Sequence, residues 1–371
     1  METQLYTGPI LLGAGGTGGH MFPAQALGEE LRRRGHQILL ITDARGQRYT
    51  ADFPADRIIE IKAANPNAGG VLGKVSAAMA LSGGLGQALK EIKNAKPIAA
   101  IGFGGYPSLP ALQGAAIRKI PYAVHEQNSQ LGRSNRFLSR GAQFLAHAFP
   151  VLTGVPASLK TPRKEVGNPV RDDVKALVGV SDYVAPETGK TFRLLITGGS
   201  QGASLFSDVP IEAISALPNH LRQSLEIEHQ VRSEDEERVN EAYHALGIKA
   251  ETAPFFGDLP RRLANAHLII ARSGASTVTE ISALGRPAIF VPLASAMDDH
   301  QTMNARVLSE ADAAILMPEK EFKSGALRGE LENLMTGEAR LTRLANNASG
   351  RVKIDAAATL ADLVEEMIEK R

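Results

Sequence analysis

The 371-residue sequence contains no cysteine. Disulfide bonds and thiol catalysis are therefore excluded, and the chain suits a reducing compartment. An excess of charge is also missing, because 41 Lys and Arg residues are balanced by 40 Asp and Glu residues. Such a chain lacks the basic surface with which proteins bind nucleic acid, so we expect no nucleic-acid partner.

Long apolar runs are absent as well. No segment approaches the length needed to span a bilayer, and residues 1–10 lack the basic stretch and the apolar stretch of a secretory signal. We therefore expect a soluble, cytoplasmic protein that would meet a membrane only at its surface.

The composition, with 36 Gly, 20 Pro and 43% apolar residues, is typical of a globular α/β protein. A chain of this length is longer than those that usually fold around a single hydrophobic core. The sequence pattern of alternating strands and helices is interrupted by a loop around residues 159–168 and then resumes. This pattern predicts two doubly wound, Rossmann-like domains. We place them at residues 1–164 and 165–351, with a C-terminal helix in residues 352–371 packing back on the first.

The first predicted strand leads into a glycine-rich turn. Residues 13–18 match the pattern G-x-G-x-x-G, a helix is expected over residues 23–34, and Asp43 ends the next strand. This arrangement predicts a dinucleotide site in which Asp43 binds a ribose. His20 follows the turn and is not part of that pattern, so the turn equally fits an imidazole and backbone amides presented to a sugar or a pyrophosphate. Both interpretations are open at this point, and so is a His20 that is only a polar residue at the start of the helix.

A second glycine-rich turn, residues 198–203 (GGSQGA), opens the second half of the chain. Further on, a buried strand over residues 267–271 is followed by a helix expected over residues 277–284. The start of such a helix has unpaired N–H groups that favour a phosphate. Glu280, one turn later, can accept hydrogen bonds from sugar hydroxyls. An ordinary strand–helix unit with a capped helix is the alternative.

Seven segments together carry a family resemblance. In chain order they are GGTGGH, GFGGYPSLP, HEQN, GNPVR, GGSQGA, RSGASTVTE and DDHQTMNA. They resemble the undecaprenyldiphospho-muramoylpentapeptide β-N-acetylglucosaminyltransferases, the MurG family, over nearly the whole chain. Three of them also have plainer interpretations. Residues 103–107 (FGGYP) can be a simple turn, residues 198–203 a tight strand–helix turn, and Arg171 a surface residue rather than a bidentate diphosphate ligand.

The resemblance implies a GT-B fold, in which two Rossmann-like domains face a cleft. The N-terminal domain would lie on the acceptor and membrane side, and the C-terminal domain would bind UDP-GlcNAc. The implied reaction is inverting transfer of N-acetylglucosamine to the 4-hydroxyl of lipid I (undecaprenyl-pyrophosphoryl-MurNAc-pentapeptide), which forms lipid II for peptidoglycan, cell shape and cell division. The resemblance also implies a peripheral location on the cytoplasmic face of the inner membrane and contact with other wall-synthesis and division proteins.

The family's substrate-binding residues are carried over one position at a time. Thr17, Gly18 and Gly19 would meet the donor near its sugar and diphosphate, Asn128 and Gln301 the GlcNAc, Arg171 and Ser200 the diphosphate, Glu280 the ribose, Ala275, Ser276, Thr277, Val278 and Thr279 the nucleotide, and Phe256 the uracil through its backbone.

Inversion requires one in-line displacement with a base that takes the proton of the acceptor hydroxyl. His20 is our first choice because an imidazole titrates near neutral pH, and Glu126 is the alternative. Helix N-termini, Ser200 and Arg171 would stabilise the leaving UDP. The sequence has no D-x-D motif where a nucleotide-sugar metal site would stand, so we expect neither a metal nor a cofactor.

Residues 69–93 carry apolar side chains beside lysines and would dock on anionic lipid. The apolar residues are Val71, Leu72, Val75, Met79, Leu81 and Leu85, and the lysines are Lys62, Lys74, Lys90, Lys93 and Lys96. A core-facing helix with a basic edge is the alternative, and the absence of Trp here departs from the family. Three rival functions remain for the whole chain: an NAD-dependent oxidoreductase, a nucleotide-sugar epimerase and a non-catalytic UDP-GlcNAc-binding scaffold.

Overall fold

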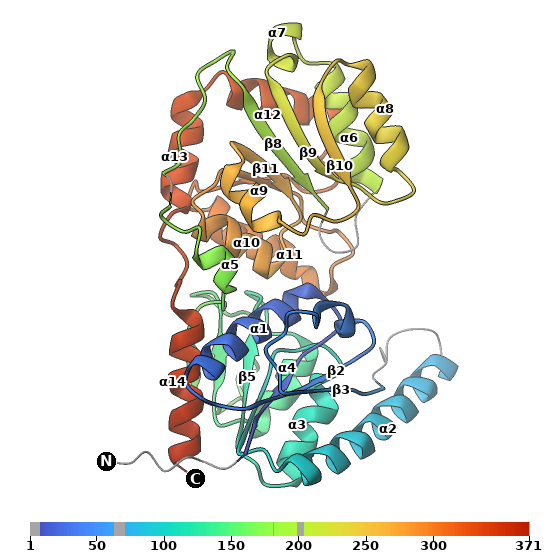
Figure 1. Ribbon diagram of the computed structural model, residues 1–371, viewed down its shortest axis with the longest axis vertical. Coiled ribbons are helices and arrows are strands. Elements are labelled where there is room, and N and C mark those ends of the chain that lie inside the picture. Colours follow the sequence, from blue (N-terminus) through green and yellow to red (C-terminus); the bar gives the residue numbers. More distant parts are fainter. Residues whose placement is uncertain (1–7, 63–70, 181, 199–203, 371) are drawn as a thin grey trace. The chain divides into compact units, whose positions relative to one another are not determined.

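A computed structural model describes residues 8–62, 71–180, 182–198 and 204–370, with the backbone alone for 71–78 and 297. The chain forms two compact units (Figure 1). The first comprises Met1–Asp172 and Lys353–Arg371, and the second comprises Asp173–Val352. The first unit thus runs past residue 164, the predicted end of the first domain, and it includes the C-terminal segment.

The first unit is built on a seven-stranded sheet of order β3-β2-β1-β4-β5-β6-β7, in which every pairing is parallel. The strands are β1 (Ile10–Gly13), β2 (Ile38–Thr42), β3 (Arg57–Glu60), β4 (Ala99–Gly102), β5 (Tyr122–Glu126), β6 (Leu145–His147) and β7 (Arg163–Glu165). A parallel sheet covered on both faces must be apolar on both faces. That is why the central strands read as continuous apolar runs in the sequence.

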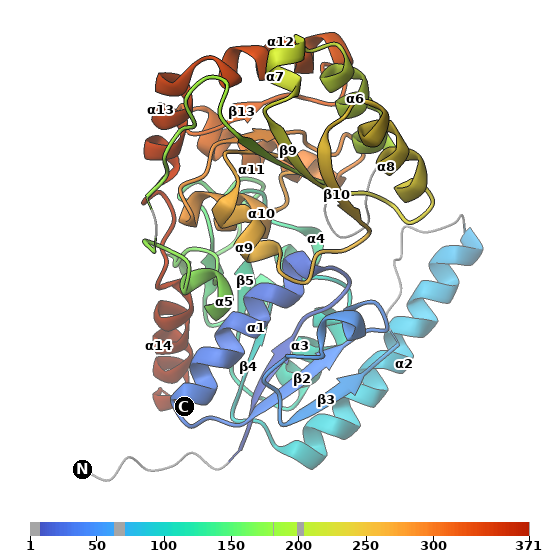
Figure 2. The ribbon, with the colours of Figure 1, turned by 45° about the horizontal axis from the view of Figure 1, so that its top comes forward.

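Helices cover the two faces of this sheet. They are α1 (Gly18–Arg33), α2 (Val71–Ala95), α3 (Ser108–Ile117), α4 (Arg133–Leu138) and α14 (Ala356–Glu369), with 3-10 turns η1 (Gly46–Tyr49) and η2 (Ser139–Gly141). Alternate residues of β1 face opposite layers: Ile10 and Leu12 pack with α1 and α14, and Leu11 packs with α2 and α3. Figure 2 shows α2 and α3 together on their face of the sheet.

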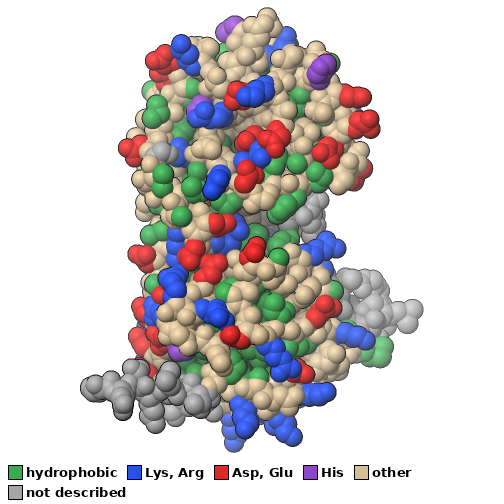
Figure 3. Space-filling view, in the orientation of Figure 1, with side chains coloured by type: hydrophobic (Ala, Val, Ile, Leu, Met, Phe, Trp, Pro, Cys, Tyr) green, Lys and Arg blue, Asp and Glu red, His purple; other side chains and the backbone are tan. Residues whose placement is uncertain are grey.

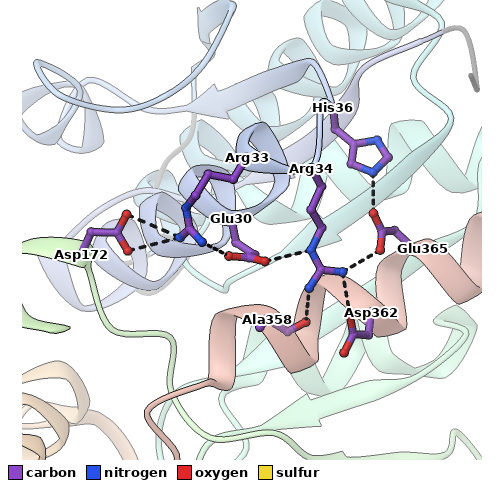
Figure 4. Close-up of polar contacts among 8 residues, drawn as sticks. All are labelled: Glu30, Arg33, Arg34, His36, Asp172, Ala358, Asp362 and Glu365. Atoms are coloured by element: carbon purple, nitrogen blue, oxygen red, sulfur yellow. Dashed lines mark hydrogen bonds and ion pairs between the residues drawn. The ribbon is translucent and has the colours of Figure 1, made fainter. Parts of the chain in front are cut away.

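The C-terminal helix α14 is bound to α1 by ionic contacts as well as by apolar ones (Figure 4). Arg34 donates to Asp362 and Glu365, each at 2.6 Å, and to Glu30 at 2.8 Å. Burial alone would lower the pKa of Arg34, but these three carboxylates raise it. His36 contacts Glu365 at 2.8 Å in the same cluster. Helix α14 is thereby held to the end of α1.

The second unit repeats the plan with a six-stranded parallel sheet of order β10-β9-β8-β11-β12-β13. Its strands are β8 (Phe192–Thr197), β9 (Leu225–Gln230), β10 (Lys249–Ala253), β11 (Leu268–Ala271), β12 (Ala288–Phe290) and β13 (Ile315–Leu316). Its helices are α5 (Asp172–Lys175), which straddles the boundary, α6 (Ser204–Ser215), α7 (Asn219–Arg222), α8 (Glu236–Ala245), α9 (Leu259–Asn265), α10 (Ala275–Ala283), α11 (His300–Ser309), α12 (Ser324–Met335) and α13 (Glu338–Ala348), with the 3-10 turn η3 (Met297–Asp299).

The order of strands reverses once in each sheet. In the first unit β1 lies between β2 and β4, and in the second β8 lies between β9 and β11. Ligands of open α/β sheets bind beyond the carboxyl ends of the strands at such switch points. The predicted fold class, α/β with two Rossmann-like parallel sheets, is confirmed, and the switch points indicate where each unit carries its site.

Candidate functional site

The glycine-rich turn after β1 presents His20 at the switch point of the first sheet. Helix α1 begins at Gly18, not at Pro23 as predicted, because the Thr17 carbonyl already accepts hydrogen bonds from the amides of His20 (3.1 Å) and Met21 (3.2 Å). Pro23 is accommodated inside the helix. The earlier start places His20 in the first helical turn, where its partly exposed side chain is held by the helix.

Asp43 at the end of β2 holds the glycine turn in place. Its Oδ1 accepts from the amides of Gly16 (2.8 Å) and Gly46 (2.9 Å), and its Oδ2 pairs with Arg45 at 3.1 Å. The side chain is only 3% exposed. A carboxylate engaged in this way is not available to a ribose, which removes the main support for the dinucleotide interpretation.

The turn after β4 packs against the ring of His20. Gly104 and Gly105 both have left-handed backbones, with φ of 86° and 73°. A Cβ at Gly104 would lie 3.2 Å from His20 Cε1, and one at Gly105 would lie 2.7 Å from the carbonyl oxygen of Gly15. Ser108 Oγ, which is buried, joins this turn to the end of β1 through the carbonyl oxygens of Gly13 (2.7 Å) and Gly104 (2.6 Å). This segment therefore acts as a turn that supports His20.

Glu126 at the end of β5 accepts four hydrogen bonds. Oε1 accepts from the backbone and side-chain amides of Asn128, both at 3.0 Å. Oε2 accepts from the Gly132 amide at 2.9 Å and from Asn135 Nδ2 at 2.8 Å. The residue is 1% exposed. Its contacts are those of a carboxylate that organises the loop after β5.

The sequence did not single out Gln127, whose side chain contacts His20. His20 Nδ1 and Gln127 Oε1 lie 3.0 Å apart, although the residues are 107 positions apart in the chain. Gln127 Nε2 lies 3.0 Å from His125 Nδ1, and His125 Nε2 lies 2.9 Å from the carbonyl oxygen of Gly167. The signal available in the sequence was the segment HEQN itself, in which buried and loop-facing polar residues adjoin the end of a strand.

Arg171, predicted to bind a diphosphate, lies beside the first turns of α1. Its guanidinium carbon is 4.1 Å from the centre of the Phe22 ring, and Phe22 itself packs against Gly18. The first unit therefore brings Arg171 to the same helix end as Thr17, Gly18 and His20.

In the second unit α10 begins immediately after β11. The Gly274 carbonyl accepts from the Val278 amide at 2.9 Å, so the helix starts at Ala275 and not at the predicted Thr277. No side chain caps this end. Ser276 Oγ is buried, and none of the described residues hydrogen-bonds to it. An uncapped helix end with an unused hydroxyl is suited to an anionic group.

The five residues predicted to line the nucleotide differ in exposure. Ser276 and Thr277 are partly exposed, whereas Ala275, Val278 and Thr279 are buried. Thr279 Oγ1 bonds back to the carbonyl oxygen of Ala275 at 2.8 Å. Only the backbone of the first turn and the side chains of Ser276 and Thr277 are therefore placed to meet a ligand.

Glu280 and the start of α11 lie close to this helix end. Glu280 is 7% exposed on α10. Ser273 Oγ donates to the Gln301 carbonyl at 2.9 Å, and Gln301 Oε1 accepts from the Leu293 amide at 3.0 Å. Because its oxygen is engaged, Gln301 has amide hydrogens to donate elsewhere. Asp299, just before α11, has a left-handed backbone with φ of 51°, a costly conformation that tends to occur at functional sites.

Two predicted residues remain. Phe256 is buried, and the guanidinium carbon of Arg262 lies 4.1 Å from the centre of its ring. Ser200, with its segment GGSQGA, lies outside the described residues. Within the described part of the chain, no three His, Asp or Glu side chains are grouped as metal ligands would be. No helix in that part of the chain combines the length and apolarity needed to cross a membrane.

Comparison with known sequences matches the chain to two family profiles. Residues 10–146 match the glycosyltransferase family 28 N-terminal domain, and residues 193–365 match the glycosyltransferase family 28 C-terminal domain. Curated relatives are UDP-N-acetylglucosamine--N-acetylmuramyl-(pentapeptide) pyrophosphoryl-undecaprenol N-acetylglucosamine transferases. That of Methylorubrum populi is 43% identical over 98% of both chains, and that of Rhodospirillum centenum is 45% identical over 96% of this chain and 93% of its own.

Solved structures agree with the sequence comparison. The chain resembles a crystal structure of Acinetobacter baumannii MurG with a TM-score of 0.74 and 30% identity, covering 97% of this chain and 99% of the other. A structure of a UDP-N-acetylglucosamine 2-epimerase from Listeria monocytogenes gives a TM-score of 0.69 at 15% identity, covering 98% of this chain and 97% of the other. The second likeness concerns the fold alone.

Proposed function

Because the chain belongs to glycosyltransferase family 28, we propose that it transfers N-acetylglucosamine from UDP-GlcNAc to the 4-hydroxyl of the muramoyl group of lipid I. The product would be lipid II, the disaccharide precursor of peptidoglycan. The observation that carries this proposal is the identity of 43–45% along nearly the full length of curated transferases named for this reaction. The epimerase likeness, at 15% identity, lends no comparable support.

The reaction we propose is a single in-line displacement. The acceptor 4-oxygen forms a bond to the anomeric carbon, the bond from that carbon to the diphosphate breaks, and UDP leaves with the electron pair. His20 takes the proton of the 4-hydroxyl as the new bond forms. A positioned general base contributes about 10²–10⁴-fold to rate. The partial exposure of His20 in the first turn of α1, together with the full engagement of Glu126, supports this assignment.

For the donor we propose contacts in both units. In the second unit the open end of α10 and Ser276 would meet phosphate, Glu280 the ribose, Gln301 the GlcNAc hydroxyls and the Phe256 backbone the uracil. In the first unit Thr17, Gly18, Gly19 and Asn128 would meet the sugar side, and Arg171 the diphosphate. Hydrogen-bond donors aimed at the leaving group stabilise the charge that develops on it. The proposed contact of Ser200 with the diphosphate rests on the sequence alone.

A transfer assay tests the reaction. Radiolabelled UDP-GlcNAc and a short-chain lipid I analogue should yield labelled lipid II analogue and UDP in equal amounts. Conversion of UDP-GlcNAc without acceptor would instead indicate an epimerase, and binding without consumption would indicate a scaffold. Turnover should persist in EDTA, because we propose that protein groups alone stabilise the leaving UDP. Loss of turnover that Mg²⁺ restores would contradict this last point.

We further propose that the enzyme binds peripherally to the cytoplasmic face of the inner membrane through α2. Met79 on α2 is 65% exposed, and Lys90, Lys93 and Lys96 near the end of that helix are exposed. Figure 3 shows Lys and Arg side chains gathered at this end of the first unit. An exposed apolar side chain and lysines along one surface helix attract anionic lipid by burial and by charge. The side chains of Val71, Leu72, Lys74 and Val75 lie outside the described residues.

Flotation with anionic vesicles separates docking from an ordinary surface helix. Met79→Ser should reduce the bound fraction without changing the melting temperature. Val151→Ser is a matched control, because Val151 belongs to the same unit and is 66% exposed but follows β6 and is not part of α2. Equal binding by both variants and the unmodified protein would argue against docking through α2.

A further inference from the structure

A continuous chain of hydrogen bonds runs from the backbone to His20 through two side chains that the proposed reaction leaves without a role. The Gly167 carbonyl oxygen lies 2.9 Å from His125 Nε2. His125 Nδ1 lies 3.0 Å from Gln127 Nε2, and Gln127 Oε1 lies 3.0 Å from His20 Nδ1. His125 and Gln127 are 0% and 1% exposed. Bulk water therefore does not reach the inner links of this chain.

The direction of every bond follows from the fixed end. A backbone carbonyl can only accept, so the proton of His125 must be on Nε2. Burial lowers the pKa of His125 to about 4, so the ring is neutral at physiological pH and its Nδ1 accepts. Gln127 must then turn its NH₂ group towards His125, and the same NH₂ group also donates to the His125 carbonyl oxygen at 3.0 Å. The two bonds fix the orientation of the amide.

The orientation of that amide decides which nitrogen of His20 is basic. Gln127 presents its carbonyl oxygen to His20, and this oxygen can only accept, so His20 carries its proton on Nδ1. Its Nε2 is left with a lone pair, and no described residue is hydrogen-bonded to that atom. Gly104 and Gly105 pack against the ring at Cε1 and Cδ2 and limit its rotation.

We propose that Gln127 is a positioning residue which, oriented by His125 and the Gly167 carbonyl, holds His20 in the Nδ1–H tautomer and so makes Nε2 the nitrogen that receives the acceptor proton. The inference rests on the proposed role of His20 as base. Gln127 touches neither substrate in this scheme and acts only through His20. The bond to Nδ1 persists after Nε2 is protonated, so the ring keeps its position throughout proton transfer.

An amide partner differs from a carboxylate partner in one measurable respect. It directs the tautomer without adding a negative charge that would stabilise protonated His20. Ionisable residues on the segments next to this ring include His125 and Glu126 on β5 and the Asp43–Arg45 pair beside the glycine turn. Each of them already has hydrogen-bond partners of its own. A carboxylate introduced at position 127 would thus be the new charge next to the ring.

Imidazole ¹⁵N NMR of the full-length protein tests the inference before any activity is measured. In the unmodified protein, His20, assigned by comparison with His20→Ala, should show the Nδ1–H tautomer. In Gln127→Met the Nε2–H tautomer should become populated. Turnover in this variant should fall by roughly 10- to 100-fold, a part of the contribution of a general base, while KM for UDP-GlcNAc stays within about twofold because Gln127 does not bind the donor in this scheme. An Nε2–H tautomer in the unmodified protein would overturn the inference.

Gln127→Glu keeps the size of the side chain and an acceptor for His20 Nδ1, so it provides a second test. Its other oxygen replaces the NH₂ group that donates to His125, so the melting temperature of this variant is measured alongside its pH profile. Its carboxylate stabilises protonated His20, so a higher pH is needed to free the base. The acidic limb of the kcat/KM profile should therefore move to higher pH, which a merely structural role would not cause. An unmoved limb, with the Met variant at normal turnover, would refute the role of Gln127.

Failure of this inference differs from failure of the proposed function. If the unmodified protein transfers no GlcNAc, the function fails whatever the tautomer. If it transfers GlcNAc and His20→Ala keeps normal turnover, the assignment of the base fails. If His20→Ala loses turnover but Gln127→Met changes neither tautomer nor rate, the positioning role alone fails.

Discussion

Replacing Glu126 by Gln should lower the stability of the first unit and not merely slow the reaction. The carboxylate accepts four hydrogen bonds from three residues, Asn128, Gly132 and Asn135. A Gln side chain has only one oxygen, which can keep the two bonds from Asn128. Its NH₂ group would then face two donors, the Gly132 amide and the Asn135 NH₂ group, and two bonds would be lost.

The expected cost follows from those two bonds. A hydrogen bond to a charged group contributes about 1.5–3 kcal/mol, so the free energy of unfolding of the first unit should fall by about 3–6 kcal/mol. For a unit of this size, about 1 kcal/mol lowers Tm by roughly 2–4 °C, so a decrease of about 6–24 °C is expected. The chain has two units, so their unfolding should be followed separately, for example by urea titration with limited proteolysis.

The assay must separate stability from catalysis. Turnover of Glu126→Gln should be measured well below its new midpoint, with His20→Ala as the catalytic comparison. We expect a destabilised protein whose folded fraction retains more activity than His20→Ala. A Glu126→Gln enzyme of normal stability whose turnover falls about 10²–10⁴-fold would refute this reasoning and return the role of base to Glu126.

Four further predictions concern separate features. His20→Ala should lower turnover by roughly 10²–10⁴-fold with UDP-GlcNAc affinity nearly unchanged in calorimetry; normal turnover would exclude His20 as the base. Glu280→Ala should weaken UDP binding by about 1.5–3 kcal/mol, and Gln at this position should cost less because one acceptor remains; unchanged UDP affinity would contradict the ribose contact. Gly84→Ala should destabilise the first unit, because its Cβ would lie 2.4 Å from the Lys62 carbonyl oxygen. In the matched variant Gly83→Ala the Cβ meets nothing within 4 Å, so this variant should stabilise the helix by about 0.5–1 kcal/mol. The reverse order of stability in urea titrations would show that the close approach at Gly84 is absent. Stability of the first unit should decline as pH falls from about 6.5 towards 4. Burial lowers the folded-state pKa of His125 to about 4, so the unfolded chain takes up the proton first. His125→Gln should flatten this decline, and an unchanged slope in that variant would assign the decline to other groups.

The fold class and the positions of most elements were readable in the sequence because they depend on local patterns. Buried parallel strands are short apolar runs, and helices between them alternate with them at a regular spacing. Helix starts were less accurate. Both α1 and α10 begin earlier than predicted, since the carbonyls of Thr17 and Gly274 open the helices and small residues follow them without a recognisable cap.

The candidate site was readable in part, because each of its motifs is a contiguous segment beside a strand end. The sequence named His20, Asp43 and Glu126 but could not assign their roles. A partner of His20 and one of Asp43 lie far away in the chain, whereas Glu126 bonds to residues that closely follow it. Asp43 turns out to bind the amide of Gly16, 27 positions away. The contact of His20 with Gln127 spans 107 positions. A hydrogen bond across such a distance exists only when the sheet has brought the ends of β1 and β5 to one edge, so the choice of basic nitrogen is a property of the folded unit and not of any segment in it.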